Sequence, residues 1–336
     1  MLAINPRRRS RLIRLATVLS VLALVVAVIF IRDNGGSSPS AGSQPSGATL
    51  QPQSAEPSAM PDAAPGGWQR VYGENFNTSL PVGSFVNKSE TDWYLADGNP
   101  YARTLRSYPD RWGTTKNRSL NYSSKTTDIV DEAYGARGVF RVHGHTASAD
   151  GVDRSLGASF FPVLNPDAPT GQEQMGQTYG RYTVRFRTVG GYRPDSAGNY
   201  PAKSKLGRYG TAFLLWPVND KWAEGEVDYP EMPWGDRISS YVHEIGAPAT
   251  TADEFKAPIR TDAGWQTATI EWYPGVLAFY LDGMLIHKVT ENVPTTAFRW
   301  GFQSGGAIAV PPPDVQGYLL VDWITIDSYQ GAVAPY

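Results

Sequence analysis

Three acidic side chains crowd into the six positions of the segment EVDYPE: Glu226, Asp228 and Glu231. Neighbouring carboxylates can divide acid and base work between them, because their mutual repulsion keeps a proton on one while another is ionised. An exposed acidic loop is the alternative interpretation. The flanking sequence argues against it, because apolar Val227 and Tyr229 alternate with the acids as in a strand with one buried face.

The direction of each side chain decides whether the three acids meet. In a strand, residues two apart point the same way, so Glu226 and Asp228 share a face, whereas Glu231 lies at an odd separation and would point to the other. A β-bulge inserts one residue and brings Glu231 back to the first face. Proline is confined to edges and bulges within sheets, so Pro230 marks the expected position of the extra residue.

Short runs that alternate between apolar and polar residues predict the strands around this segment. Arg181–Val189 alternates strictly, Thr267–Val289 predicts two or three strands, and Gly317–Tyr329 closes the chain. The Asp-Gly pair within Leu281–Met284 is typical of a tight hairpin. Ile238–His243 predicts an antiparallel neighbour of the acidic strand, joined to it by the segment PWGD.

The fold class follows from these strands. The sequence shows no long helical periodicity and no internal repeat, and parallel βαβ units would need intervening helices. We therefore predict an all-β domain, a two-sheet antiparallel sandwich or jelly roll, over residues 67–336. The chain has no cysteine, which excludes disulfides, thiol nucleophiles and Cys-ligated metals.

Residues 1–31 have a pattern different from that of the predicted strands. A basic segment, residues 1–14 with five arginines, precedes seventeen almost entirely apolar residues, 15–31. This pattern predicts a transmembrane signal-anchor with the arginines in the cytoplasm and the remainder outside. No small-residue cleavage site follows Ile31, so we favour an uncleaved anchor, with secretion after cleavage as the alternative.

Residues 32–66 are rich in Ser, Pro and Gly and predict a disordered linker. Residues 1–66 hold six arginines and three acids of the chain's 30 basic and 32 acidic residues, so residues 67–336 hold 24 and 29, a net charge of −5. A mildly acidic domain without a basic cluster argues against nucleic acid as a partner. We expect a monomer.

The acidic triplet points to one reaction in particular. Retaining glycoside hydrolysis uses an ionised nucleophile and a protonated acid about 5–5.5 Å apart across the scissile bond. Glu226 and Glu231 could supply the two groups, and Asp228 between them could tune the pair through hydrogen bonds.

Beyond the residues themselves, EVDYPE resembles the bulged active-site strand of glycoside hydrolase family 16, which includes β-1,3(4)-glucanases, agarases, carrageenases and xyloglucan transglycosylases. Five other segments resemble family segments in the family's order and extend the similarity over most of residues 68–330: YGRYTVRFR, FLLWP, WQTATIEWYPGVLAFYLDGMLI, FRWGFQSG and VDWITI. The insert Gly190–Gly210 fits no glucanase or agarase pattern, which leaves the substrate open.

The resemblance implies a concave sheet carrying the cleft, with Glu226 as nucleophile, Asp228 as its assistant and Glu231 as general acid/base. It further implies that substrate contacts come from Trp216, the sugar-stacking tryptophan, and from His243, Gln303, Trp300, Arg181 and Tyr179. Asp322 and Glu74 match positions near a structural calcium in some family members, and no other cofactor is expected.

The function expected from the sequence is a retaining endo-glycoside hydrolase that acts on a β-linked, β-glucan-like polysaccharide outside the cytoplasmic membrane. Two alternatives remain open. One is a transglycosylase that remodels an envelope glycan, and the other is a carbohydrate-binding jelly roll without catalysis.

Overall fold

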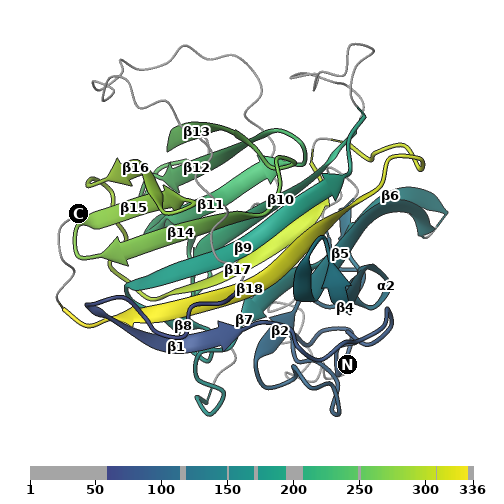
Figure 1. Cartoon of the computed structure of the whole chain (residues 1–336), viewed down its shortest axis with the longest axis horizontal. Coiled ribbons are helices and arrows are strands. Elements are labelled where there is room, and N and C mark those ends of the chain that lie inside the picture. The colour runs from purple at the N-terminus through teal and green to yellow at the C-terminus, as the bar shows by residue number, and fades with distance from the viewer. Residues whose placement is uncertain are drawn as a thin grey trace, which may run out of the picture.

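In the computed structural model of the chain, strands of alternating apolar and polar residues form two stacked β-sheets (Figure 1). The structure describes residues 59–113, 119–149, 151–169, 173–193, 207–248, 251–307 and 309–331. These residues form 18 strands, one four-residue helix and one short 3-10 turn, so the prediction of an all-β two-sheet sandwich of jelly-roll type is confirmed.

A ten-stranded sheet has the order β16-β15-β14-β9-β18-β5-β6-β3, with β1 paired to β18 and β4 paired to β5. All of its pairs are antiparallel except β3 with β6. Its elements, with the helix α2 that precedes β4, are β1 (Trp68–Glu74), β3 (Ser119–Asn121), α2 (Ser123–Thr126), β4 (Thr127–Ala133), β5 (Ala136–Ala149), β6 (Val152–Gly157), β9 (Gly180–Gly190), β14 (Gln266–Tyr273), β15 (Val276–Leu281), β16 (Met284–Val289) and β18 (Gly317–Tyr329).

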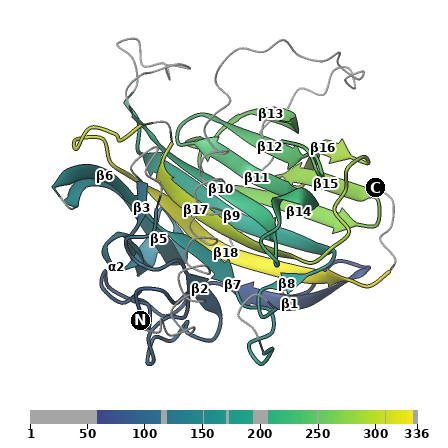
Figure 2. The same ribbon diagram turned by 180° about the vertical axis from the view of Figure 1, so that it is seen from behind.

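An eight-stranded sheet has the order β13-β12-β11-β10-β17-β7-β2, with β8 paired to β17, and it forms the second layer seen from behind in Figure 2. The acidic segment is its third strand from one edge. Its elements, with the 3-10 turn η1 that precedes β11, are β2 (Leu105–Ser107), β7 (Ser159–Pro162), β8 (Gly176–Gln177), β10 (Tyr209–Pro217), η1 (Trp222–Glu224), β11 (Glu226–Pro233), β12 (Arg237–His243), β13 (Ala252–Arg260) and β17 (Phe298–Gly306).

The local signals in the sequence are confirmed where the structure describes them. Asp282 and Gly283 both have positive φ, 48° and 78°, and they join β15 to β16 as the Asp-Gly hairpin signal predicts. The predicted strand Arg181–Val189 is β9, and the segment PWGD joins β11 to β12.

The predicted anchor, residues 15–31, lies outside the described residues, as do residues 1–14 and most of the predicted linker. The linker's last residues, 59–66, are described and contain no regular secondary structure. In the part of the chain that is described, no helix has the length and apolar character that a membrane span requires.

A single aromatic-rich core fills the space between the sheets. Phe213 of β10 lies at its centre, with ring centroids 5.3–5.8 Å from Phe186, Trp300 and Phe302. Residues of β10 and β17 enter this core in alternation, so the intervening residues of these two strands occupy the opposite, outer face of the eight-stranded sheet.

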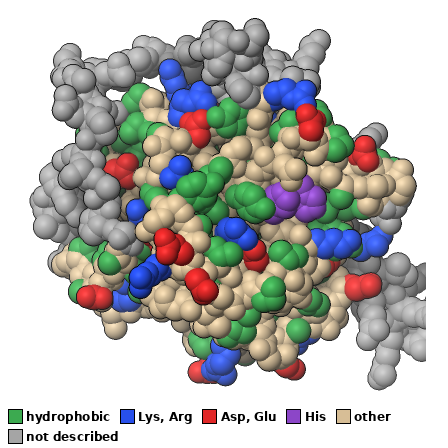
Figure 3. All heavy atoms as spheres, turned by 45° about the vertical axis from the view of Figure 1, so that its right-hand side comes forward, with side chains coloured by type: hydrophobic (Ala, Val, Ile, Leu, Met, Phe, Trp, Pro, Cys, Tyr) green, Lys and Arg blue, Asp and Glu red, His purple; other side chains and the backbone are tan. Residues whose placement is uncertain are grey.

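On the outside of the molecule, the face shown in Figure 3 carries acidic and basic side chains interspersed with hydrophobic ones. No large field of one charge stands out in this view.

The close packing on the outer face of β17 can be tested by replacing two of its glycines. A Cβ at Gly301 would lie 2.4 Å from Cδ1 of Phe161 and 2.5 Å from the carbonyl oxygen of Phe160, whereas at Gly305 the nearest atoms, in Ser119, are 3.4 Å away. We expect Gly301→Ala to lower the free energy of unfolding by about 1–3 kcal/mol through overpacking. Gly305→Ala, on the same strand and face, is the matched control. Equal urea midpoints for the two variants would contradict this packing.

Candidate active site

A β-bulge in β11 sets the direction of the acidic side chains. Between Asp228 and Glu231, β11 advances three residues while both neighbouring strands, β10 and β12, advance two. The extra residue falls at Tyr229–Pro230, where the peptide bond is cis. The predicted bulge at Pro230 is thereby confirmed.

The bulge separates the strand into an apolar face and an acidic face. Val227, Tyr229, Met232 and Trp234 belong to the core between the sheets. The three acids take the alternate positions and lie on the outer face of the eight-stranded sheet. If the same residues formed a regular strand without the bulge, the side chain of Glu231 would enter the core in place of Met232.

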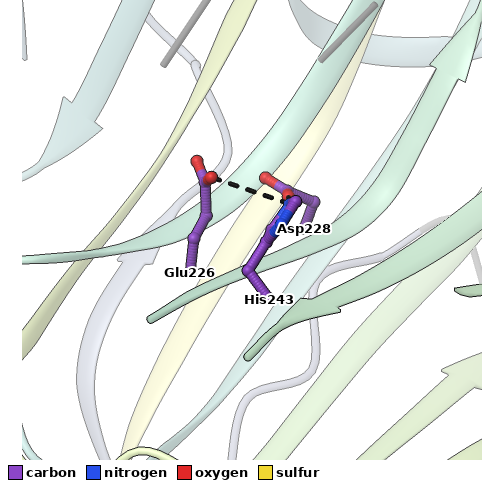
Figure 4. A group of neighbouring side chains, drawn as sticks. All are labelled: Glu226, Asp228 and His243. Carbon is purple, nitrogen blue, oxygen red and sulfur yellow. Dashed lines mark hydrogen bonds and ion pairs between the residues drawn. The ribbon is translucent and has the colours of Figure 1, made fainter. Parts of the chain in front are cut away.

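His243 of β12 is the closest basic group to the acids. It stands directly opposite Glu226 in the register, and its Nε2 lies 3.1 Å from Oδ2 of Asp228 and 3.8 Å from Oε2 of Glu226 (Figure 4). Within the described part of the chain, neither oxygen of Glu226 has a hydrogen-bond partner. Among the same residues, Oδ1 of Asp228 likewise has no hydrogen-bond partner.

The three acids are almost completely enclosed. Glu226 and Asp228 are each 1% exposed and Glu231 is 5% exposed. Burial without full hydrogen bonding penalises an ionised carboxylate strongly, so these groups favour their neutral forms more than surface acids do.

The pKa of each acid reflects this enclosure. Burial, then the charges of Asp228 and Glu231, raise the pKa of Glu226 well above its usual value. Burial, then the charge of Asp228, raise the pKa of Glu231 well above its usual value. Burial also raises the pKa of Asp228, but the hydrogen bond and charge of His243 oppose the rise. Asp228 is therefore the acid with a partner that favours its ionised form.

The ligand atoms of Glu226, Asp228 and His243 lie within 4.8 Å of one another, which would also suit a bound cation. The hydrogen bond between His243 and Asp228 already joins two of the three side chains. In this geometry Nε2 of His243 is hydrogen-bonded to Asp228 and lies 3.8 Å from Oε2 of Glu226.

Two further predicted substrate contacts share the outer face with the acids. Gln303 of β17 stands opposite Ala212 of β10, which in turn stands opposite Glu231, so the three form one row across the sheet. Trp216 of β10 lies on the same face, and its Nε1 donates to Oδ1 of Asp220 at 3.0 Å. The structure thus brings Trp216, Gln303 and His243 to the face that carries the acids.

Trp216 is covered by a second tryptophan that the sequence analysis did not select. The ring of Trp222, in η1, lies 5.9 Å from that of Trp216 and 5.2 Å from that of His243. Trp216 is consequently 2% exposed, whereas Trp222 is only partly buried. Of the two rings, Trp222 is the more accessible to a ligand.

Three predicted substrate contacts lie elsewhere, and these predictions are corrected here. Trp300 points into the core, where its ring stacks near Phe213 and Tyr182. Arg181 of β9 lies on the other sheet, with Nε 3.2 Å from Glu271. Tyr179 packs against Trp272 and Tyr329, also on that sheet. The predictions failed because the pairing and face of these strands, which the sequence does not give, decide where each side chain points.

The two residues predicted to lie near a calcium ion each have a partner within the protein. Asp322 forms an ion pair with Arg185 of β9, and an oxygen of Glu74 accepts a hydrogen bond from the N–H of Phe76 at 2.9 Å. Neither belongs to a group of three metal-ligating side chains among the described residues. Their placement gives no support to a calcium site.

Arg299 is a further residue of this face that the sequence analysis missed. Its guanidinium lies 5.2 Å from the ring centroid of Trp93 and 5.8 Å from that of Phe161, and its Nη2 donates to Oδ1 of Asp220 at 2.7 Å. Asp220 also accepts from Trp216, so Arg299 connects that tryptophan to an aromatic group on β7 and the loop before β2. The alternation of β17 could have indicated its face once Trp300 was known to be core.

The fold is similar to that of several solved endo-glycanases, at identities too low to show more than the fold. An endo-β-1,3-glucanase from Pyrococcus furiosus matches with a TM-score of 0.53 and 14% identity, over 78% of this chain and 95% of its own. SCLam, a non-specific endo-β-1,3(4)-glucanase from family GH16, matches with a TM-score of 0.52 and 14% identity, over 80% and 98%. An endo-acting O-glycanase of the human gut microbiota matches with a TM-score of 0.51 and 15% identity, over 81% and 94%.

No protein-family model and no curated protein matches the chain. The resemblance to glycoside hydrolase family 16 is confirmed at the level of the fold, a jelly-roll sandwich of the kind that GH16 glucanases have.

The raised pKa of Glu226 gives a stability prediction with a definite sign. The folded-state pKa of Glu226 lies above its unfolded-state value near 4.5. As the pH rises above that value, Glu226 therefore lowers the free energy of unfolding, and this loss reaches its full size above the folded-state pKa. Glu226→Gln should therefore raise the free energy of unfolding at pH 8, by on the order of 1–3 kcal/mol, and have little effect at pH 4.

The measurement is the melting temperature of both proteins between pH 4 and pH 8. Glu224→Gln is a nearby control, since Glu224 is hydrogen-bonded to Asn219 and Thr296 and its pKa is lowered. That variant should not be stabilised at pH 8. A Glu226→Gln protein that melts lower than wild type at pH 8 would contradict the enclosure of this acid.

Proposed function

We propose that the protein is a retaining endo-glycoside hydrolase that acts on a β-linked polysaccharide, with a β-glucan as the substrate class. One observation supports this most: the bulge in β11 gathers Glu226, Asp228 and Glu231 on one face of the sheet, beside tryptophans. The glucanase names of the structurally similar proteins agree with this substrate class.

In the proposed reaction, Glu231 donates its proton to the glycosidic oxygen while a carboxylate oxygen of Glu226 attacks the anomeric carbon. The sugar–oxygen bond breaks and a glycosyl ester forms on Glu226. Glu231, now ionised, takes a proton from water as the water attacks the same carbon, which releases the sugar and frees Glu226.

Asp228 and His243 prepare Glu226 for this role. The hydrogen bond between His243 and Asp228 lies beside Glu226, and the imidazole Nε2 is 3.8 Å from Oε2 of Glu226. A proton shared within this group leaves Glu226 able to be ionised when Glu231 is neutral, which is the charge distribution that the first step needs.

The aromatic side chains around the acids suit a sugar chain. Trp222 presents a partly exposed ring beside His243, and Trp93 presents another beyond Arg299. Aromatic rings pack well against the apolar faces of pyranose sugars. We assign Trp222, supported from beneath by Trp216, as the ring next to the reacting sugar.

We further propose that the protein works outside the cytoplasmic membrane as a monomer, held by the apolar segment of residues 15–31 and acting on polysaccharide without nucleic acid or an added cofactor. This part of the proposal rests on the sequence alone. Protease accessibility of the domain in intact cells tests it.

Transfer of the sugar to another glycan is the second candidate. The enclosure of all three acids favours it, because a site that excludes water lets an acceptor sugar compete for the glycosyl intermediate. Products formed from unlabelled polysaccharide and a fluorescent oligosaccharide acceptor distinguish the two outcomes, since only transfer places label on longer chains.

Removal of either glutamate should abolish turnover without unfolding the domain. We expect Glu226→Gln and Glu231→Gln each to lower kcat by at least about a thousandfold, because each removes a group that bonds to the reacting atoms. The assay is release of reducing ends from β-glucans, galactans and envelope polysaccharides, with circular dichroism to verify folding. Near-normal activity in either variant would refute the mechanism.

The stereochemistry of the product provides an independent check. NMR of the first product should show the β-anomer, as double displacement requires. If a folded wild-type protein binds a glycan but cleaves and transfers none, the non-catalytic alternative is the correct one.

A further inference from the structure

Two oppositely charged side chains lie beyond Glu231 on the edge strand β13. In the sheet register, Glu231 of β11 faces Ser239 of β12, and Ser239 faces Lys256 of β13. In the adjacent row, Asp228 faces Tyr241, and Tyr241 faces Glu254. The acids and these charges therefore occupy two neighbouring rows of one sheet.

Both charged residues point to the face that carries the acids. Their neighbours on β13, Phe255 and Ala257, pack into the core, so Glu254 and Lys256 take the outer positions. Strands in a sheet lie about 4.8 Å apart, which places the backbone of Lys256 roughly 10 Å from that of Glu231. Long side chains can cover much of that distance.

Tyr241 connects Glu254 to the site. Its hydroxyl donates a hydrogen bond of 2.8 Å to Oε1 of Glu254, and its ring lies beside that of His243. The charges of Glu231 and Glu254 both contribute to raising the pKa of Tyr241 above its usual value, after burial. The tyrosine is therefore within electrostatic reach of both glutamates.

The residues around Glu231 differ on its two sides: those on β10 and β17 are uncharged, and those on β13 are charged and exposed. Neighbouring β10 contributes the uncharged Ala212, and Gln303 of β17 is uncharged as well. Beyond burial and Asp228, the pKa of Glu231 is raised by Glu254 and lowered by Lys256. Besides Glu231, the titratable or charged residues that alternate onto this face of β11, β12 and β13 are Glu226, Asp228, Arg237, Tyr241, His243, Glu254, Lys256 and Arg260. Arg237, Glu254 and Lys256 are exposed, and of these three Glu254 and Lys256 shift the pKa of Glu231.

We propose that Glu254 and Lys256 are positioning residues for the proton of Glu231: Glu254 retains the proton and Lys256 promotes its release. This inference rests on the proposed function of Glu231 as acid/base. Neither residue bonds to the reacting atoms. Together they set the pH range in which Glu231 can donate its proton and then accept one from water.

The two residues must shift the activity profile in opposite directions. Removing the negative charge in Glu254→Gln lowers the pKa of Glu231, so the alkaline limb of kcat/KM moves to lower pH. Removing the positive charge in Lys256→Met moves that limb to higher pH. A unit charge at this separation near a protein surface shifts the limb by about half a pH unit.

Salt separates this electrostatic role from a structural one. Both groups are exposed, so 1 M NaCl, with a Debye length of about 3 Å, should remove most of the shift in both variants. Glu291→Gln and Lys288→Met are matched controls, because they remove the same charges at exposed positions in β16 and the loop after it. The controls should leave the alkaline limb unchanged.

A second readout does not need activity. The stability difference between wild type and Glu231→Gln grows as the pH rises and levels off at the folded-state pKa of Glu231. Measured by thermal unfolding, this levelling point should fall in the Glu254→Gln background and rise in the Lys256→Met background.

The two readouts distinguish the failure of each claim. Absence of cleavage or transfer with every glycan overturns the proposed function, and the unfolding data then decide whether Glu254 and Lys256 act on Glu231. Unchanged levelling points in both backgrounds, or shifts of the same sign, overturn the inference even when the enzyme is active.

Discussion

Strict alternation of side chains along a strand is the constraint on which this site depends. β11 must place Val227, Tyr229, Met232 and Trp234 in the core and three acids on the other face, and a regular strand of this sequence cannot do both. The extra residue at Tyr229–Pro230 resolves the conflict locally. Core residues flank the acids on both sides of the bulge, so the backbone at each glutamate is fixed between buried side chains.

Gathering three acids in an enclosed site opposes stability, and among the described residues His243 is the basic side chain that is hydrogen-bonded to one of them. The surrounding sandwich must offset this cost, and its aromatic core is suited to do so because large buried rings contribute most to packing. The same crowding and burial raise the pKa of all three carboxyl groups, which is the kind of perturbation that acid–base catalysis uses.

Local sequence signals predicted the features that depend on neighbouring residues. The Asp-Gly turn, the alternation of β9 and the bulge at Pro230 each follow from a few adjacent positions. The placement of Trp300 and Arg181 could not be predicted in this way, because it depends on which strands pair and which face each presents. The enclosure of Trp216 by Trp222 was missed for a related reason: the turn η1 folds back over the strand that precedes it. Glu254 is 23 residues from Glu231 and gave no signal at all.

The surroundings of the two glutamates support their different roles. Glu226 lies beside His243, whose ring packs against that of Trp222, and its oxygens have no hydrogen-bond partner in the part of the chain that is described. A nucleophile needs such a setting, because it forms and breaks one bond to carbon and exchanges no proton with solvent. An acid/base must give up a proton and regain one in every cycle. Glu231 lies next to the polar strands β12 and β13, where Tyr241 leads to the exposed Glu254. Glu231, to which we assign the exchange of protons in the proposed reaction, is therefore the glutamate closer to the charged residues of the sheet edge.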